Sequence, residues 1–151
     1  MQIRRDSIVN LTLPKFSAHK NGTDQVDVPT GVWTKVTFTT EEYDIGSKYD
    51  AVNSKWIPGV VGQAHIDGMV KFRVLVDQSL IGISIFKNGI EYKSKLIGAS
   101  GTDDQGADLS MDITVTAVED YFEIYGRQDT GVNKDIRGLA VATFFMGHML
   151  L

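Results

Sequence analysis

Apolar and polar residues alternate with a period of two through most of this chain. The clearest runs are VWTKVTFTT (32–40), AHIDGMVKFRVLVD (64–77) and DLSMDITVTAV (108–118), all rich in β-branched residues. Successive side chains of a β-strand point to opposite faces, so this alternation predicts strands with one buried face and one wet face. No segment keeps the 3.6-residue apolar period of an amphipathic helix. The chain is therefore expected to be all-β.

Three further segments have the composition of strands: LIGISIFKNGIEYKSKLI (80–97), DYFEIYGRQ (120–128) and RGLAVATFFMGHML (137–150). The first contains Asn88-Gly89, a strong signal for a two-residue hairpin turn. The connections between runs are short, polar and rich in Gly, Asp and Ser. Strands that recur at such intervals predict an antiparallel β-sandwich or jelly roll.

Composition excludes several classes of protein. The 151 residues are about one domain, and the absence of cysteine excludes a disulfide framework, a thiolate zinc site and a cysteine nucleophile. A formal charge of −4 weighs against a nucleic-acid surface. No apolar run approaches the roughly 18 residues of a membrane span, and Asp6 and Asn10 interrupt any signal-peptide core. We expect one domain over residues 15–151, preceded by residues 1–14 as a lead-in strand or attachment segment, with no nucleic-acid partner and no membrane insertion.

The last predicted strand is apolar on both faces. Alternation places Phe144 and Met146 on one face and Phe145 and Met149 on the other. One face can meet the core of the sandwich, and the other needs a second apolar surface. A neighbouring subunit would supply that surface; a covering loop or the lead-in segment are the alternatives.

The order of several short motifs resembles that of the C1q-like domain, which shares its fold with the tumour-necrosis-factor (TNF) ligands. The motifs are KFSAHKNG (15–22), YDAVNSKWIPGVVG (49–62), IGISIFKNG (81–89), DYFEIYG (120–126) and LAVATFFMGHM (139–149). The pattern departs from the family after Gly62, where QAHI (63–66) replaces Gly-aromatic-x-Phe. The resemblance implies a jelly roll that assembles as a compact homotrimer.

The resemblance also places residues around the expected three-fold axis. We expect the axis to be lined by side chains of the last strand and its neighbours, while Phe145 and Phe122 turn towards the core of each subunit; the alternative is that the two faces of the last strand are exchanged. The predicted interface residues are Tyr121, Tyr125, Phe144 and Met146.

The stretch YDAVNSKWIP (49–58) carries two aromatic residues around a polar turn. We expect Tyr49 and Trp56 to pack at the edge of the sandwich, Asn53-Ser54 to form the turn, and Pro58 to end strand pairing because it has no N–H. In the alternative interpretation, Trp56 is a stacking platform for a sugar.

A second candidate ligand site lies where a strand runs into a polar loop. Tyr125 offers a stacking face and a hydroxyl, while Arg127 and Asp129 can hold sugar hydroxyls or an acidic sugar. We expect ligands at loop tips or at the seams between subunits. An ordinary solvated turn is the alternative.

The sequence shows no catalytic motif, and no catalytic residue or resident cofactor is expected. His19 and His65 have no nearby carboxylate or second histidine in the sequence at metal-ligand spacing, and His148 lies in the apolar last strand. Asp103, Asp104 and Asp108 offer hard oxygen ligands for calcium, but the EF-hand spacing is missing and a solvated loop is the alternative.

These features predict a non-enzymatic trimeric binding or structural module. The context expected for it is a virion fibre, head spike or tail tip that recognises a host-surface glycan or protein, on the virion surface or otherwise extracellular. Residues 1–14 would then attach to a fibre or capsid protein. One alternative is a carbohydrate-active or lectin-like sandwich with Trp33, Trp56 and Tyr125 around a groove; another is a soluble TNF-like signalling ligand.

Overall fold

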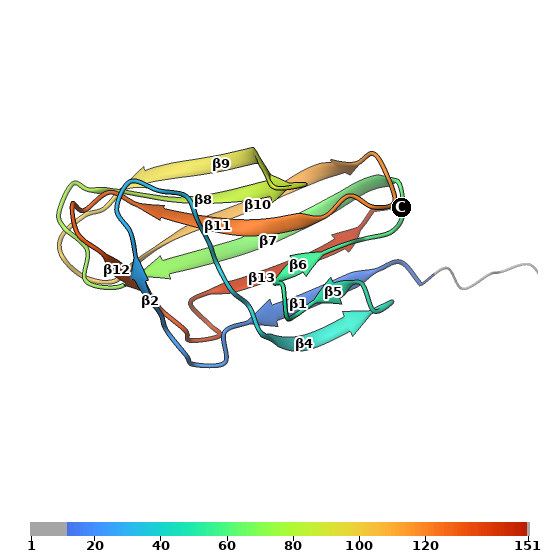
Figure 1. Cartoon of the computed structure of the whole chain (residues 1–151), viewed down its shortest axis with the longest axis horizontal. Coiled ribbons are helices and arrows are strands. Elements are labelled where there is room, and N and C mark those ends of the chain that lie inside the picture. Colours follow the sequence, from blue (N-terminus) through green and yellow to red (C-terminus); the bar gives the residue numbers. More distant parts are fainter. Residues whose placement is uncertain (1–11, 151) are drawn as a thin grey trace, which may run out of the picture.

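The structure, a computed structural model, describes residues 12–150, and these residues form an all-β sandwich (Figure 1). None of them belongs to a helix long and apolar enough to cross a membrane. The strands are β1 (Lys15–His19), β2 (Gln25–Val28), β3 (Thr34–Lys35), β4 (Thr40–Ile45), β5 (Tyr49–Asp50), β6 (Lys55–Trp56), β7 (Gly62–Phe72), β8 (Leu80–Lys87), β9 (Ile90–Gly98), β10 (Gln105–Val115), β11 (Phe122–Gln128), β12 (Lys134–Ile136) and β13 (Phe144–Met149).

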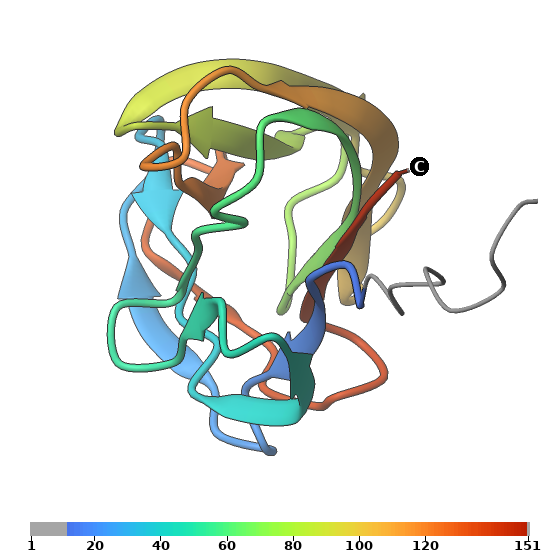
Figure 2. The ribbon, with the colours of Figure 1, turned by 90° about the vertical axis from the view of Figure 1, so that its right-hand side faces the viewer.

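Two antiparallel sheets make up the sandwich. The first, called sheet A here, runs β10-β7-β13-β1-β4; β12 also pairs with β7, beyond the start of β13, and β2 pairs with β12. The second, sheet B, runs β9-β8-β11, after which the short strands β3 and β6 both pair with β11, and β5 pairs with β6. Seen nearly end-on, the two sheets enclose the core between them (Figure 2).

Alternation decides which residues enter the core. Along β7, for example, Ala64, Ile66, Val70 and Phe72 are fully buried, while His65, Asp67, Met69 and Lys71 face away from the core. Aromatic rings fill one end of the core, where Phe16 stacks on Tyr49 with ring centroids 4.6 Å apart. The predicted all-β sandwich, with strand faces set by the period of two, is therefore confirmed.

The Asn88-Gly89 hairpin is also confirmed. Lys87 pairs with Ile90, and the two loop residues have φ angles of 53° and 79°. Both central residues of a type I′ turn need positive φ, which asparagine and glycine adopt at low cost.

Several strand predictions were too long, and two of them differ most in what replaces the strand. The predicted strand 137–150 begins only at Phe144, because residues 140–142 form a turn in which the Ala142 and Thr143 N–H groups donate to the Leu139 carbonyl. The predicted strand 32–40 is paired only at Thr34–Lys35 and at Thr40, where β4 begins, although Val36 and Phe38 are buried as the alternation requires. The predicted lead-in segment, residues 1–14, lies mostly outside the described residues.

Candidate assembly and binding faces

The water-facing side of sheet A carries a stripe of apolar side chains. Phe144 lies opposite Met69 on β7, and Met146 follows two residues later on the same face of β13. All three side chains are only partly buried, so the part of the chain that the structure describes, residues 12–150, leaves them partly open to solvent. Phe145, between the two β13 residues, is fully buried in the core. The structure thus confirms the prediction that Phe144 and Met146 lie on the opposite face of the last strand from Phe145.

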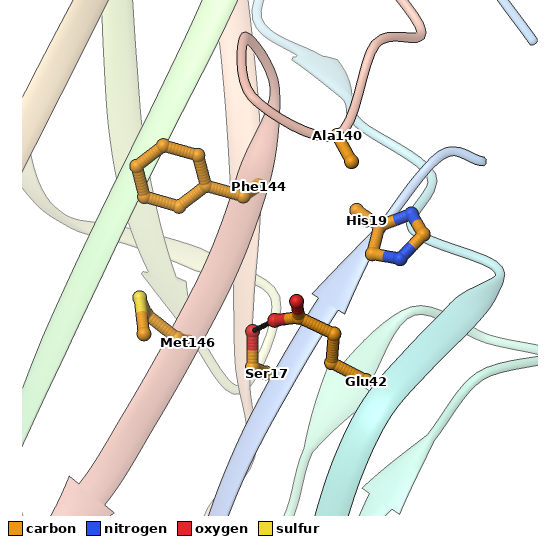
Figure 3. A pocket seen from close by; sticks show the side chains of 6 residues that line it. All are labelled: Ser17, His19, Glu42, Ala140, Phe144 and Met146. Carbon is orange, nitrogen blue, oxygen red and sulfur yellow. Dashed lines mark hydrogen bonds between the residues drawn. The ribbon is translucent and has the colours of Figure 1, made fainter. Parts of the chain in front are cut away.

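Two shallow hollows flank the apolar stripe. One, of about 190 Å³, lies between β13 and β1 and is shown in Figure 3, lined by Ser17, His19, Glu42, Ala140, Phe144 and Met146. In it Ser17 Oγ donates a hydrogen bond of 2.8 Å to Glu42 Oε2. The other, of about 250 Å³, lies over β7 and β10 and includes Asp67, Asp108 and Ser110. The face is therefore apolar in the middle and ridged rather than flat.

A polar cluster lies at one end of this face, around His65. Its Nδ1 is 2.7 Å from Asp112 Oδ1, and its Nε2 is 3.0 Å from Ser110 Oγ and 3.4 Å from Asp67 Oδ1. The hydrogen bond with Asp112 raises the pKa of His65, with a further contribution from Asp67. The expectation that His65 lacks nearby carboxylates was wrong, because register brings Asp112 opposite it across β7 and β10. The ring of His148 lies beside it, with centroids 5.5 Å apart.

The water-facing side of sheet B carries an aromatic cluster. Phe86 and Tyr125 are stacked with ring centroids 3.7 Å apart and planes 15° apart. Trp33 meets Phe86 edge-on at 6.4 Å. Alternation directs Phe86 and Tyr125 outward, because the preceding residues Ile85 and Ile124 point into the core.

Charged side chains border this aromatic cluster. Lys35 and Glu123 form an ion pair with each other across β3 and β11. Arg127 shares the outward face of β11 with Tyr125 and forms no ion pair with any described residue. Asp129 follows the end of β11 and is exposed. Of the predicted ligand residues, Tyr125 and Arg127 therefore lie on a sheet face rather than at a loop tip.

The four predicted interface residues do not share one surface. Phe144 and Met146 face outward from sheet A, whereas Tyr125 faces outward from sheet B. Tyr121 precedes β11 and lies under Lys55, whose Nζ is 5.0 Å from its ring centroid. The prediction placed β11 beside the last strand, but the topology separates them into different sheets, so Tyr121 and Tyr125 cannot join Phe144 and Met146 around one axis through the face of sheet A.

Trp56 is a core residue, so its interpretation as a sugar platform was wrong. Its side chain is fully buried between Phe16, at 5.2 Å, and Phe122, at 6.4 Å between ring centroids. Tyr49 is also buried and donates its hydroxyl to the Phe38 carbonyl at 2.8 Å. Both aromatics of the 49–58 stretch are thus buried, and they lie on β5 and β6, the last two strands at one edge of sheet B.

The three aspartates proposed for calcium do not converge. Asp104 pairs with Arg137 and accepts the Val74 N–H at 2.9 Å, whereas Asp108 pairs with Lys95 at 3.2 Å. Among residues 12–150 no three His, Cys, Asp or Glu side chains are grouped as metal ligands. The charges of Asp104 and Asp108 are instead compensated by cations of the chain.

Sequence reasoning missed residues whose roles depend on pairing. Nothing in the sequence singles out Phe86 or Met69 as a surface contact, and only register brings them beside Tyr125 and Phe144. The same holds for Ser110 and the carboxylates around His65. Period-two alternation within each run was the one available signal, since it marks all these residues as outward-facing.

Comparison with known proteins gives a likeness in structure alone. No family model and no curated protein sequence matches the chain. The structure of murine APRIL at pH 5.0 superposes with a TM-score of 0.69 at 10% identity, covering 91% of this chain and 99% of that one. The globular domain of zebrafish complement 1qA gives 0.64 at 13% identity, covering 92% and 98%. Eiger TNF from S. frugiperda gives 0.62 at 10% identity, covering 91% of each.

These identities are low, while the coverage of both chains is nearly complete. The shared property is therefore the arrangement of the two sheets. The chain has the antiparallel jelly-roll fold of the TNF ligands and C1q globular domains.

Proposed function

We propose that this chain is a non-enzymatic binding module that acts as a homotrimer, assembled through the outer face of sheet A. The observation that carries the proposal is the orientation of β13. Phe144 and Met146, together with Met69, place an apolar stripe on the water side of a sheet whose other side already forms the core. An apolar stripe of this kind gains free energy when another surface covers it.

A second copy of the same face is the occupant that the fold supports. The likeness to TNF ligands and C1q domains implies three-fold assembly, and the hollows on either side of Phe144 provide recesses for side chains of neighbouring subunits. The histidine cluster would then lie at one end of the assembly face. Burial in the interface would keep substrates away from His65 and Ser110. The cluster therefore fits a structural role in positioning the subunits better than it fits hydrolysis.

The wider role that we propose is recognition of a host-surface glycan or protein by a virion fibre, head spike or tail tip. Assembly through sheet A leaves the opposite face, with Trp33, Phe86 and Tyr125, directed outward. Residues 1–14 would connect the module to a fibre or capsid protein. The module would accordingly act on the virion surface or in another extracellular setting.

A soluble signalling ligand is the second candidate, favoured by the likeness to APRIL and Eiger TNF. The two roles differ in what the assembled protein binds. Saturable binding to a receptor ectodomain, with none to glycans or to cell-surface preparations of a host, would favour signalling over attachment.

The experiment that tests assembly is light scattering on the purified chain. The expected mass at micromolar concentration is three times the chain mass of 16.7 kDa. Phe144→Asp should reduce the mass to that of a monomer while the far-ultraviolet circular dichroism stays that of a folded β-protein. Val52→Asp, at a position that is 91% exposed in the turn between β5 and β6, is the matched control and should remain trimeric. A monomeric mass for the unmutated chain would refute the proposal.

The non-enzymatic part has its own test. Ser110, His65 and Asp112 are hydrogen bonded in the order that serine hydrolases use. The chain should nevertheless show no ester or glycoside hydrolysis above that of a Ser110→Ala variant. Turnover that this substitution abolishes would show that the module is an enzyme.

A further inference from the structure

The outer face of sheet B carries more apolar surface than its own packing requires. Trp33, Phe86 and Tyr125 form a continuous row of rings, and Leu96 of β9 lies beside them with 50% of its surface exposed. We call these four residues the aromatic platform. They lie on the water side of a sheet whose core side is already filled by Ile81, Ile83 and Ile85.

The side chains of the platform pack close against sheet B because the outward-facing residues of β8 beneath them are small. Gly82 and Ser84 are the outward-facing residues of β8 next to Phe86. A Cβ added to Gly82 would be 3.0 Å from Trp33 Cη2 and would also collide with Leu96. Glycine at this position therefore lets Trp33 and Leu96 approach the sheet and each other. The result is a broad apolar surface rather than separate projecting side chains.

One cation borders the platform without a countercharge. Arg127 lies directly opposite Gly82 in the register of β11 and β8, on the same face as Tyr125. It forms no ion pair within residues 12–150, whereas nearby Lys35 is neutralised by Glu123. A planar guanidinium with free donors pairs well with a carboxylate, in a two-pronged geometry where space allows.

We propose that the aromatic platform binds a carboxylated pyranose sugar, such as a uronic or sialic acid residue of a glycan. The apolar face of the sugar ring would pack on Trp33 and Tyr125, and its carboxylate would pair with Arg127. Aromatic rings provide a rigid apolar surface for such a contact, and the unpaired cation selects the acidic sugar over a neutral one. The inference rests on the proposed binding role and names its ligand class, but it does not depend on trimer formation.

The two tryptophans provide a direct readout, because Trp56 is fully buried and Trp33 belongs to the platform. The full chain is titrated with the methyl glycosides of glucuronic acid and N-acetylneuraminic acid while tryptophan fluorescence is followed. Methyl glucoside is the neutral counterpart of the glucuronide. At least one acidic glycoside should change the fluorescence saturably and bind about tenfold or more tightly than methyl glucoside, the ratio expected for a charge-assisted hydrogen bond.

Variants separate the parts of the site. Trp33→Phe should abolish the fluorescence change, with binding then followed by ligand-observed NMR. Arg127→Gln should remove the preference for the acidic sugar, and Tyr125→Ala should weaken binding of every sugar. Tyr43→Ala is the matched control, since Tyr43 is a tyrosine 40% exposed on β4 in the other sheet, and it should bind as the unmutated chain does.

Several results would overturn the proposal: no binding of either acidic glycoside at millimolar concentration, equal affinity for acidic and neutral sugars, or the same loss in Tyr43→Ala as in Tyr125→Ala. Circular dichroism of each variant shows whether a loss comes from unfolding, and the conservative Arg127→Gln change keeps the test decisive if Tyr125→Ala does not fold. Light scattering on the same samples distinguishes the two proposals. A monomer that binds the acidic sugar would refute the trimer alone, and a trimer that binds none would refute this site alone.

Discussion

Phe144 and Phe145 are adjacent in β13, but they face opposite sides of sheet A. Phe145 is fully buried and meets Phe16 edge-on, with ring centroids 4.7 Å apart. Phe144 lies on the other side, at the border of the two surface hollows. One step along a strand thus separates the core of the subunit from the face that we propose for assembly.

Phe145→Ala should destabilise the subunit itself. Removal of a fully buried phenylalanine costs about 3–5 kcal/mol of the free energy of unfolding, through lost burial and the cavity left behind. Urea denaturation of this variant in the monomeric Phe144→Asp background should show that loss in full. Phe144→Ala in the otherwise unmutated chain should instead lower the assembled mass on dilution. A loss for Phe145→Ala below about 0.5 kcal/mol in the Phe144→Asp background, as expected for an exposed residue, would contradict the assignment of faces.

Trp56→Phe should be milder than its complete burial suggests. Trp56 Nε1 is buried without a hydrogen-bond partner in the described structure, and an unsatisfied buried donor costs about 1–3 kcal/mol. Phenylalanine removes that donor while it keeps most of the ring contacts with Phe16 and Phe122. We expect a loss below about 2 kcal/mol for Trp56→Phe and about 3–5 kcal/mol for Trp56→Ala, measured by urea denaturation. A loss for Trp56→Phe above about 2 kcal/mol would mean that the indole N–H is satisfied.

The predictability of this fold from sequence follows from what alternation can and cannot encode. A period of two states which side chains share a face, and it placed Phe144 and Phe145 correctly on opposite faces. It does not state which strands are neighbours. The error over Tyr121 and Tyr125 arose at that step, because β11 follows β10 in sequence but pairs with β8 in sheet B.

The same limit explains what was missed at the candidate sites. The His65 cluster joins residues 45 and 47 positions apart in sequence, and only the register of β7 with β10 brings them together. Trp56 was misplaced for a different reason. A two-residue strand beside a proline is typical of an exposed sheet edge. Instead, β6 pairs with Phe122 of β11, and the Trp56 side chain is buried in the core.

Asp120→Asn should destabilise the chain most at neutral pH. The carboxylate is almost fully buried, pairs with Lys87 at 2.9 Å and accepts hydrogen bonds from Asn88 Nδ2, the Ala117 N–H and the Thr116 N–H and hydroxyl. Burial alone raises the pKa of Asp120, but these donors together hold it well below its usual range. Loss of one partner of a buried ion pair costs about 3–5 kcal/mol, and the amide keeps part of the hydrogen bonding, so we expect about 3 kcal/mol.

The pH dependence has a definite sign. The folded-state pKa of Asp120 is depressed, so its stabilisation is present above the unfolded value of about 3.9 and is lost as pH falls below it. The difference between the unmutated chain and Asp120→Asn should therefore shrink on acidification from neutral pH to below that value. Asp129→Asn, at an exposed site, is the control and should change stability by less than about 0.5 kcal/mol. If the difference in unfolding free energy between the two chains stays constant through the acid range, the ionised carboxylate of Asp120 does not stabilise the fold.

His65 should make stability fall as pH rises through the neutral range. Its folded-state pKa is raised, chiefly by the hydrogen bond with Asp112, so its stabilisation is fully present below the unfolded value of about 6.5. That stabilisation is lost as pH rises through the folded pKa, because the unfolded chain releases the proton first.

His65→Gln should flatten this slope of the unfolding free energy, measured by urea denaturation at one fixed subunit concentration. Asp112→Asn should move the NMR titration midpoint of the His65 ring down towards its ordinary value. Asp129→Asn, at an exposed site outside the His65 cluster, is the control and should leave the slope in place. An unchanged slope in His65→Gln would show that the ring does not bind its proton more tightly in the folded chain.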